Sequence, residues 1–146
     1  MQKLNLPPCD LKLKTEEGNE FVFDIIRKKY VVLTPEEWVR QHFTHLMINH
    51  LKYPKSMMKV ETGLSYFKSQ KRSDISIMKP DGTTFLVVEC KNPEVKINRE
   101  ALNQIATYNK VVEAHYVAIT NGLNHFIWKL ESGKYTQLKE FPIYKA

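Results

Sequence analysis

The sequence has little of what secreted or membrane-spanning proteins need. It holds two cysteines among 146 residues, too few for the disulfide framework of a small secreted fold. No apolar run approaches the length of a membrane span, and residues 1–13 have no apolar core of signal-peptide length. Cys90 lies inside an apolar run, where a buried free thiol is expected. We therefore expect a cytoplasmic protein with no membrane partner.

The sequence also lacks the Gly-x-x-x-x-Gly-Lys-Ser/Thr loop of nucleotide-driven motors, and it has no internal repeat or flexible linker. A hydrophobic fraction of 42% and a charged fraction of 26% are ordinary for a globular chain. The length predicts a single domain, residues 1–146. The net charge of +6 is compatible with a polyanionic partner, although surface lysines of any soluble protein would explain it as well.

Capping and turn signals divide the chain into helices and strands. Thr34 is the expected N-cap of a first helix, with Pro35 at its first position and Glu37 completing a capping box. Pro54 prevents this helix from continuing far beyond residue 51. Asn98 is expected to cap a second helix that reaches about residue 113. Strands are predicted over residues 60–67, 74–78, 84–90, 116–120 and 126–130, after a short N-terminal hairpin of residues 11–14 and 21–23.

The connections between these elements predict how the strands pair. The Asp81-Gly82 dipeptide is typical of a hairpin, which makes the strands on either side antiparallel. The helix after Asn98 is a crossover, so the strands before and after it should be parallel. We therefore expect an α/β fold with a mixed central sheet flanked by helices. Its order from Thr34 is α-β-β-β-α-β, preceded by the short N-terminal β-hairpin.

Two charged residues stand at the end of the most apolar strand. Glu89 and Lys91 share one face because side chains alternate along a strand. Taken alone, they are explained by a strand that leaves the core. Asp74 changes this, because the turn at residues 81–82 is about as far from Asp74 as from Glu89, so the two carboxylates can be cross-strand neighbours. Opposed carboxylates repel each other unless something compensates their charge.

A divalent cation would provide this compensation. Mg²⁺ prefers hard oxygen ligands, so Asp74 and Glu89 are the predicted ligands, with the main-chain carbonyl of Cys90 as a further one. The Lys91 ammonium could orient a water molecule or neutralise charge on a phosphate. On a basic protein, this set favours phosphodiester hydrolysis over peptide or ester chemistry.

The same residues resemble a known signature. Ser73-Asp74 followed by Glu89-Cys90-Lys91 looks like the PD-(D/E)xK motif of a nuclease superfamily, with Ser73 in place of the leading proline. Gln104 and Tyr108 form a Q-x-x-x-Y pattern on one face of the next helix. Together with residues 33–41, this order resembles the N-terminal nuclease domain of type I restriction enzyme R (motor) subunits, and the likeness extends over about residues 27–130.

The resemblance implies a restriction-endonuclease-like core at residues 27–131, with residues 1–26 as an N-terminal extension. It implies an endonuclease that cleaves DNA with Mg²⁺ or Mn²⁺. It also implies that Gln104 and Tyr108 support catalysis or DNA contact, although a tyrosine packed beside a surface glutamine would give the same pattern. Such nucleases often add an acid from the first helix. The helical wheel favours Glu36 over Glu37, and both could instead be helix-dipole partners.

Several basic residues flank the motif and could follow a phosphate backbone, although a solvated loop is an equally good explanation. They are Lys68, Lys71, Arg72, Lys96 and Arg99. DNA is the expected partner, and motor or specificity subunits of a restriction system are further candidates. The sequence leaves the choice between DNA and RNA open, and also the oligomeric state.

Other functions remain open at this stage. The chain could be a catalytically silent DNA- or partner-binding module of the same fold, or a junction resolvase or repair nuclease. Type I R subunits couple their nuclease to a motor whose nucleotide-binding loop is missing from this sequence. A stand-alone nuclease, a part of a larger protein and a remnant are therefore all compatible with it.

Overall fold

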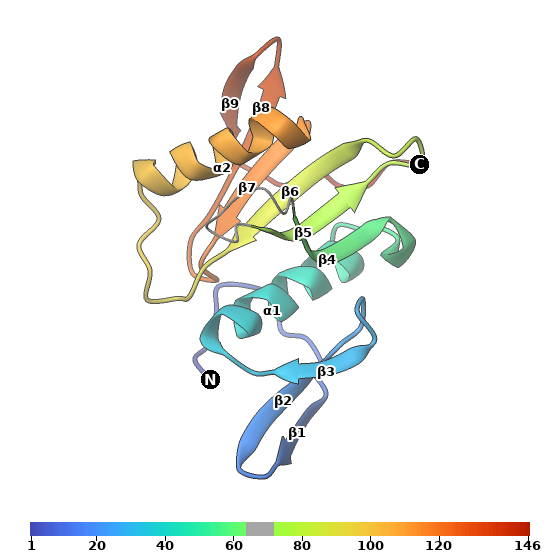
Figure 1. The fold of residues 1–146 in the computed structure, drawn as a ribbon, viewed down its shortest axis with the longest axis vertical. Coiled ribbons are helices and arrows are strands. Elements are labelled where there is room, and N and C mark those ends of the chain that lie inside the picture. The colour runs from blue at the N-terminus through green and yellow to red at the C-terminus, as the bar shows by residue number, and fades with distance from the viewer. Residues whose placement is uncertain (64–71) are drawn as a thin grey trace.

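In the computed structural model, which describes residues 1–63 and 72–146, two β-sheets lie on either side of the first α-helix (Figure 1). The small sheet consists of β1 (Leu13–Glu16), β2 (Asn19–Asp24) and β3 (Lys29–Val32). The large sheet consists of β4 (Met58–Gly63), β5 (Arg72–Met78), β6 (Thr84–Cys90), β7 (Tyr116–Thr120), β8 (His125–Glu131) and β9 (Lys134–Leu138). The helices are α1 (Pro35–Asn49), the short 3₁₀ helix η1 (Lys55–Met57) and α2 (Arg99–Val112).

The large sheet is mixed, as the sequence predicts. Its strands follow one another in the order β4 to β9, and each neighbouring pair is antiparallel except β6 and β7. The parallel pair is joined by α2, which is the predicted crossover. The strand expected at residues 60–67 begins earlier, at Met58, and its predicted end lies outside the described residues. The mixed sheet with two α-helices is thereby confirmed.

The small sheet is larger than the predicted N-terminal hairpin. β1 pairs with β2, and β2 pairs in turn with β3, which forms in the connector between the hairpin and the first helix. The turn before β3 is organised by Asp24, whose Oδ1 accepts the main-chain N–H groups of Ile26 and Arg27 at 2.8 and 2.7 Å. Aspartate commonly begins such turns, because its carboxylate replaces a main-chain acceptor.

α1 begins as predicted but its capping differs in one respect. Thr34 Oγ1 accepts a hydrogen bond from Glu37 N at 3.0 Å, and Pro35 occupies the first turn. The Glu37 carboxylate does not complete the capping box. It accepts instead from Arg27, Arg40 and Gln41. This part of the prediction was wrong because buried cations offered the carboxylate stronger partners than a main-chain N–H.

Each face of the large sheet is covered by one helix. Alternation along β6 sends Leu86 and Val88 into the apolar cluster that contains Val39 and Phe43 of α1. Val87 points the opposite way, into the cluster formed with α2. Tyr108 of α2 belongs to this second cluster and is buried. Because the middle of β6 is buried on both faces, its polar side chains reach solvent at the strand ends, and Glu89 lies at the C-terminal one.

The chain termini pack against the body of the protein. Leu4 is buried beside the β7–β8 turn, where Asn5 N donates to Gly122 O at 2.8 Å. Gly122 has φ +86°, which favours glycine, and a Cβ atom at this position would lie 2.7 Å from Leu4 Cδ2, so Leu4 would have to shift. Among the helices of residues 1–63 and 72–146, none is both long and apolar enough to cross a membrane.

Candidate active site

Asp74 lies in β5 and both of its carboxylate oxygens have donors. Oδ2 accepts from Cys90 N on the neighbouring strand β6 at 2.6 Å. Oδ1 accepts from Arg40 Nη2 of α1 at 2.5 Å. The Asp74 side chain is 8% exposed. This carboxylate is therefore held between the C-terminal end of β6 and the first helix.

Glu89 and Lys91 stand at the C-terminal end of β6. The last pair of the β5–β6 ladder is Ile75 with Val88, and Asp74 and Glu89 are the residues next to it on the two strands. Lys91 N donates to Thr120 O of β7 at 2.8 Å, which fixes the backbone at Lys91. Lys91 Nζ lies 3.7 Å from Glu89 Oε1, and both side chains are less than one-fifth exposed. The two residues share a face, as strand alternation predicts.

The Glu-x-Lys pair faces the second helix. Glu89, Lys91, Gln104 and Tyr108 line one narrow recess between the end of β6 and α2. Gln104 and Tyr108 reach it together because they are one helical turn apart. Tyr108 is buried and Gln104 is exposed. The four motif residues from two separate elements therefore border the same space.

Arg40 is the site residue that sequence reasoning missed. Its guanidinium is buried, and it donates to the carboxylates of Glu37, Glu36 and Asp74. Burial alone would lower the pKa of Arg40, but the charges of Asp74 and Glu37 outweigh it and raise this pKa above its usual value. A signal was present in the sequence: Arg40 follows Glu36 and Glu37 by four and three residues, so one helix face carries all three.

The structure separates the two acids of the first turn of α1. Glu36 Oε1 is 3.2 Å from Arg40 Nη2, and the Glu36 side chain is 47% exposed. Burial and the nearby Asp74 charge raise the pKa of Glu36, while Arg40 and Lys91 partly offset the rise. Glu37 is buried, which the helical wheel did not predict. The helical-wheel argument assumed a single buried face on α1, whereas a second face of this helix packs against the small sheet.

The carboxylates at this site have cationic partners within the protein. Asp74 contacts Arg40, and Glu89 contacts Lys91. These cations compensate the carboxylates from within the protein, and the sequence argument had not counted the one from α1. The predicted metal site stays a prediction. In the part of the chain that the structure describes, no three His, Cys, Asp or Glu side chains are grouped closely enough to hold a metal.

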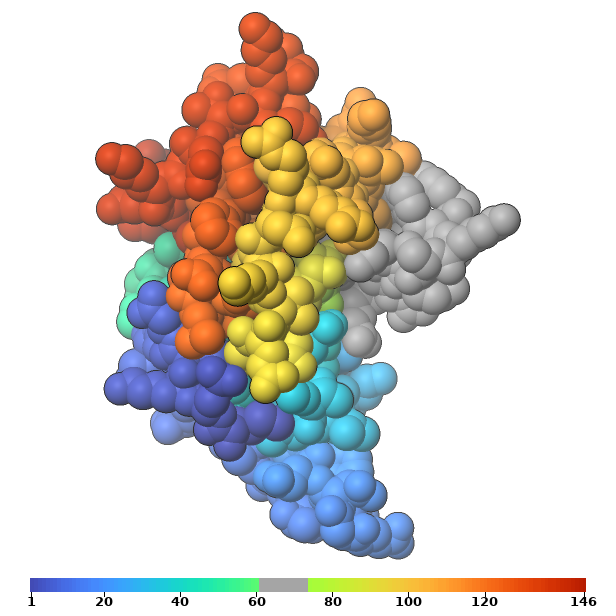
Figure 2. Space-filling model, turned by 90° about the vertical axis from the view of Figure 1, so that its left-hand side faces the viewer, coloured from blue at the N-terminus to red at the C-terminus, as the bar shows by residue number. Residues whose placement is uncertain are grey.

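The other expected site residues fall into three groups. Lys96 and Arg99 are exposed at the segment that joins β6 to α2, which lies at the surface of the face shown in Figure 2. Lys68 and Lys71 lie outside the described residues, and the side chain of Arg72 does as well. Cys90 is a buried free cysteine, as predicted, and burial followed by the Asp74 charge raises the pKa of its thiol well above the usual value.

Comparison with known protein families assigns the chain to one of them. The family described as type I restriction enzyme R protein N terminus (HSDR_N) matches residues 35–142. This match covers most of the 146 residues, so the chain belongs to that family. No curated protein matches it. The predicted resemblance to the N-terminal domain of type I R subunits is thereby confirmed.

Proposed function

We propose that this protein is a Mg²⁺- or Mn²⁺-dependent deoxyribonuclease that hydrolyses phosphodiester bonds within DNA on a restriction-endonuclease-like core. The observation that carries the proposal is the convergence of Glu89, Lys91, Gln104 and Tyr108 on one recess. Asp74 lies in β5 beside the last pair of the β5–β6 ladder, and its Oδ2 accepts from Cys90 N. Membership of the HSDR_N family supports a nuclease-like role for this arrangement.

The charge of the site suits a divalent cation. The described side chains that are linked by ion pairs around α1 and β6 include five carboxylates and three cations. They are Asp24, Glu36, Glu37, Asp74 and Glu89 against Arg27, Arg40 and Lys91. When all are ionised, negative charge exceeds positive charge by two units, which is the charge of one Mg²⁺ ion. At Asp74, Oδ1 accepts from Arg40 and Oδ2 accepts from Cys90 N, so each oxygen keeps a second lone pair beside this donor.

The residues that would hold the ion are Asp74, Glu89 and the main-chain carbonyl of Cys90. Mg²⁺ needs only one or two carboxylates, because water and phosphate oxygens complete its coordination. When bound, the metal would polarise a phosphoryl oxygen and make a bound water more acidic. The donor set therefore fits this ion in its chemistry, and Arg40 is the group that competes with it for Asp74.

The remaining site residues act on the phosphate and the water. The Lys91 ammonium would stabilise the negative charge that develops on the phosphoryl oxygens. Gln104 and Tyr108 would donate hydrogen bonds to a scissile group positioned at the mouth of this recess. Glu36 is a carboxylate with a raised pKa near Asp74 and Lys91, and we assign it as the additional acid from the first helix. Lys96 and Arg99 would contact the DNA backbone outside the recess.

Supercoiled plasmid DNA provides the test. We expect Mg²⁺-dependent or Mn²⁺-dependent nicking by the purified protein, abolished in Lys91→Ala and in Asp74→Asn. Lys110→Ala is the matched control, because Lys110 is an exposed lysine of α2 and its loss should leave the rate unchanged. Equal nicking by the wild type and both site variants would refute the proposal.

A catalytically silent DNA-binding module is the second candidate. It is favoured by one observation: Arg40 and Lys91 already neutralise the two predicted metal ligands. This candidate predicts salt-dependent DNA binding without nicking, and the same affinity in Asp74→Asn. Motor and specificity subunits of a restriction system are the protein partners that we propose to add to such assays, since type I R subunits couple a nuclease to a motor.

A further inference from the structure

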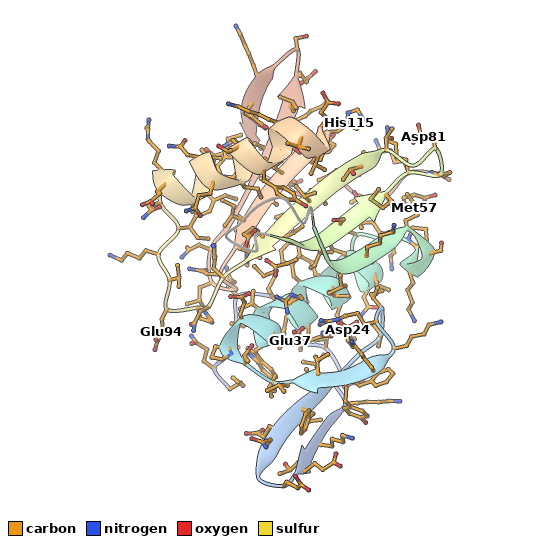
Figure 3. All side chains as sticks on the ribbon, in the orientation of Figure 1. Asp24, Glu37, Met57, Asp81, Glu94 and His115 are labelled. Carbon is orange, nitrogen blue, oxygen red and sulfur yellow. The ribbon has the colours of Figure 1, made fainter. Side chains whose placement is uncertain are left out.

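A line of buried ionic side chains connects the small sheet to Asp74. Arg27 Nε donates to Asp24 Oδ2 at 2.8 Å, and Arg27 Nη2 donates to Glu37 Oε2 at 2.9 Å. Glu37 Oε1 accepts from Arg40 Nη1, and Arg40 Nη2 reaches Asp74 Oδ1 at 2.5 Å. Figure 3 shows Asp24 and Glu37 in the layer between the small sheet and α1. The line runs from the β2–β3 turn to the proposed metal ligand.

The first member of this line is held from several sides. Asp24 is fully buried, and its carboxylate accepts from two main-chain N–H groups of the turn. Gln41 Nε2 lies 2.8 Å from Asp24 Oδ2 and 2.9 Å from Glu37 Oε2, so it joins the two acids from the side of α1. The Arg27 guanidinium forms a fork of hydrogen bonds to Asp24 and Glu37, and Asp24 anchors this fork in the turn. Because the donors of a guanidinium lie in one rigid plane, the position of Asp24 determines that of Glu37.

The last member needs such support. Asp74 has one main-chain donor, Cys90 N, and its other oxygen is aligned by Arg40. Arg40 is itself aligned by Glu37, which the Arg27 fork holds. Buried ion pairs contribute little net stability compared with apolar residues of the same volume. A fully hydrogen-bonded buried network can instead fix one arrangement of its groups.

We propose that Asp24 and Arg27 are positioning residues that set the orientation of the Asp74 carboxylate through Glu37 and Arg40. The β2–β3 turn is then a working part of the site, although both residues precede the segment matched by the family, residues 35–142. The sequence-based division into residues 1–26 and 27–131 stays a prediction, and it falls between these two hydrogen-bonded residues. The catalytic consequence of this inference rests on the proposed nuclease function.

The Cys90 amide reports on the orientation of Asp74 without any enzyme assay. Its N–H donates to Asp74 Oδ2 at 2.6 Å, so its proton resonance responds to small movements of that oxygen. Arg27→Lys keeps the charge but cannot reproduce the fork that spans Asp24 and Glu37. We expect the Cys90 amide resonance to move in Arg27→Lys. Lys29→Met, which changes an exposed lysine of β3, is the matched control and should leave the resonance in place.

A second variant guards against a folding defect. Asp24→Asn retains the size of the side chain and removes the charge that anchors Arg27. If Arg27→Lys unfolds, the Cys90 amide is followed in Asp24→Asn, with the dispersion of the other amide resonances as the test of folding. An unmoved Cys90 resonance in a folded Arg27→Lys or Asp24→Asn protein overturns the proposal. The turn would then be only a structural support of α1.

Nuclease kinetics separate positioning from DNA binding. Misplacement of a reacting group by about 1 Å can slow a reaction by about 100-fold, so we expect kcat to fall at least about 10-fold in Arg27→Lys while KM for DNA stays constant. A change in KM with constant kcat would overturn the positioning role. If the wild type does not cleave DNA at all, the proposed function fails, and the Cys90 resonance still decides whether the turn positions Asp74.

Discussion

Replacement of Arg40 by methionine should reveal how strongly the fold depends on this buried cation. Methionine keeps the apolar stem and removes the guanidinium that contacts three carboxylates. The Glu36 contact is half exposed and contributes little. Glu37 keeps Arg27 and Gln41 as partners. The principal loss is therefore at Asp74, which is left buried with one main-chain donor.

The expected effect of Arg40→Met is a loss of about 3–5 kcal/mol in the free energy of unfolding, the range found when one partner of a buried ion pair is removed. Urea denaturation at pH 7 with an unchanged m-value measures it. Arg99→Met is the control, since Arg99 is exposed and its loss should change stability by less than about 0.5 kcal/mol.

A double variant tests whether the uncompensated charge is the cause. Adding Asp74→Asn to Arg40→Met neutralises the stranded carboxylate. We expect the double variant to be more stable than Arg40→Met alone, by an interaction energy of about 0.5–3 kcal/mol. Two outcomes would refute the reasoning from the buried ion pair. In one, Arg40→Met lowers the free energy of unfolding by less than about 1 kcal/mol. In the other, the losses from Arg40→Met and Asp74→Asn simply add in the double variant.

Three further results are expected. Hydrogen bonds from Arg27 N, Gln41 and the Arg27 side chain outweigh burial and lower the pKa of Asp24 below 3.8. Its contribution to stability is therefore present above about pH 3.8 and lost as pH falls through the lower folded value. In urea titrations the stability difference between wild type and Asp24→Asn should thus shrink on acidification below that pH, and a difference that grew would contradict it. Gly122→Ala should be more destabilising than Gly82→Ala. Both positions have positive φ, but only a Cβ at Gly122 would meet Leu4 at 2.7 Å; equal melting temperatures would show that Leu4 yields freely. The pKa of Glu36 is raised, so ionised Glu36 opposes folding at neutral pH. Glu36→Gln should therefore preserve or increase stability in urea while it slows plasmid nicking. Unchanged nicking would remove Glu36 from the site.

Most of the fold followed from local signals in the sequence. The strands at residues 84–90 and 116–120 were predicted with the bounds that the structure has, because continuous apolar runs between turn signals leave little freedom. The cap at Asn98 also behaved as expected, with its side chain accepting from Ala101 N at 3.0 Å. The third strand of the small sheet was missed. Residues 29–32 are exposed or half exposed and therefore carry no clear alternating pattern.

The placement of the candidate site residues could be predicted only where strand geometry determines it, and their roles stay predictions. The alternation of Glu89 and Lys91 and the hairpin that opposes Asp74 to Glu89 both follow from sequence spacing. The Arg40 contact does not, because it depends on how α1 crosses the ends of β5 and β6. The burial of Glu37 depends likewise on the small sheet, whose packing against α1 is a tertiary event. Helix periodicity describes one buried face, and α1 has two.

The arrangement around α1 explains why conservative substitutions on its two faces should affect different properties of this protein. The apolar face of the helix, with Val39 and Phe43, is fully buried against the large sheet and supplies the hydrophobic stabilisation. Its polar face, with Glu37 and Arg40, supplies position instead, because buried ion pairs recover little more than their desolvation cost. Substitutions on the apolar face should therefore lower the free energy of unfolding. Conservative substitutions on the polar face should first change the orientation of Asp74.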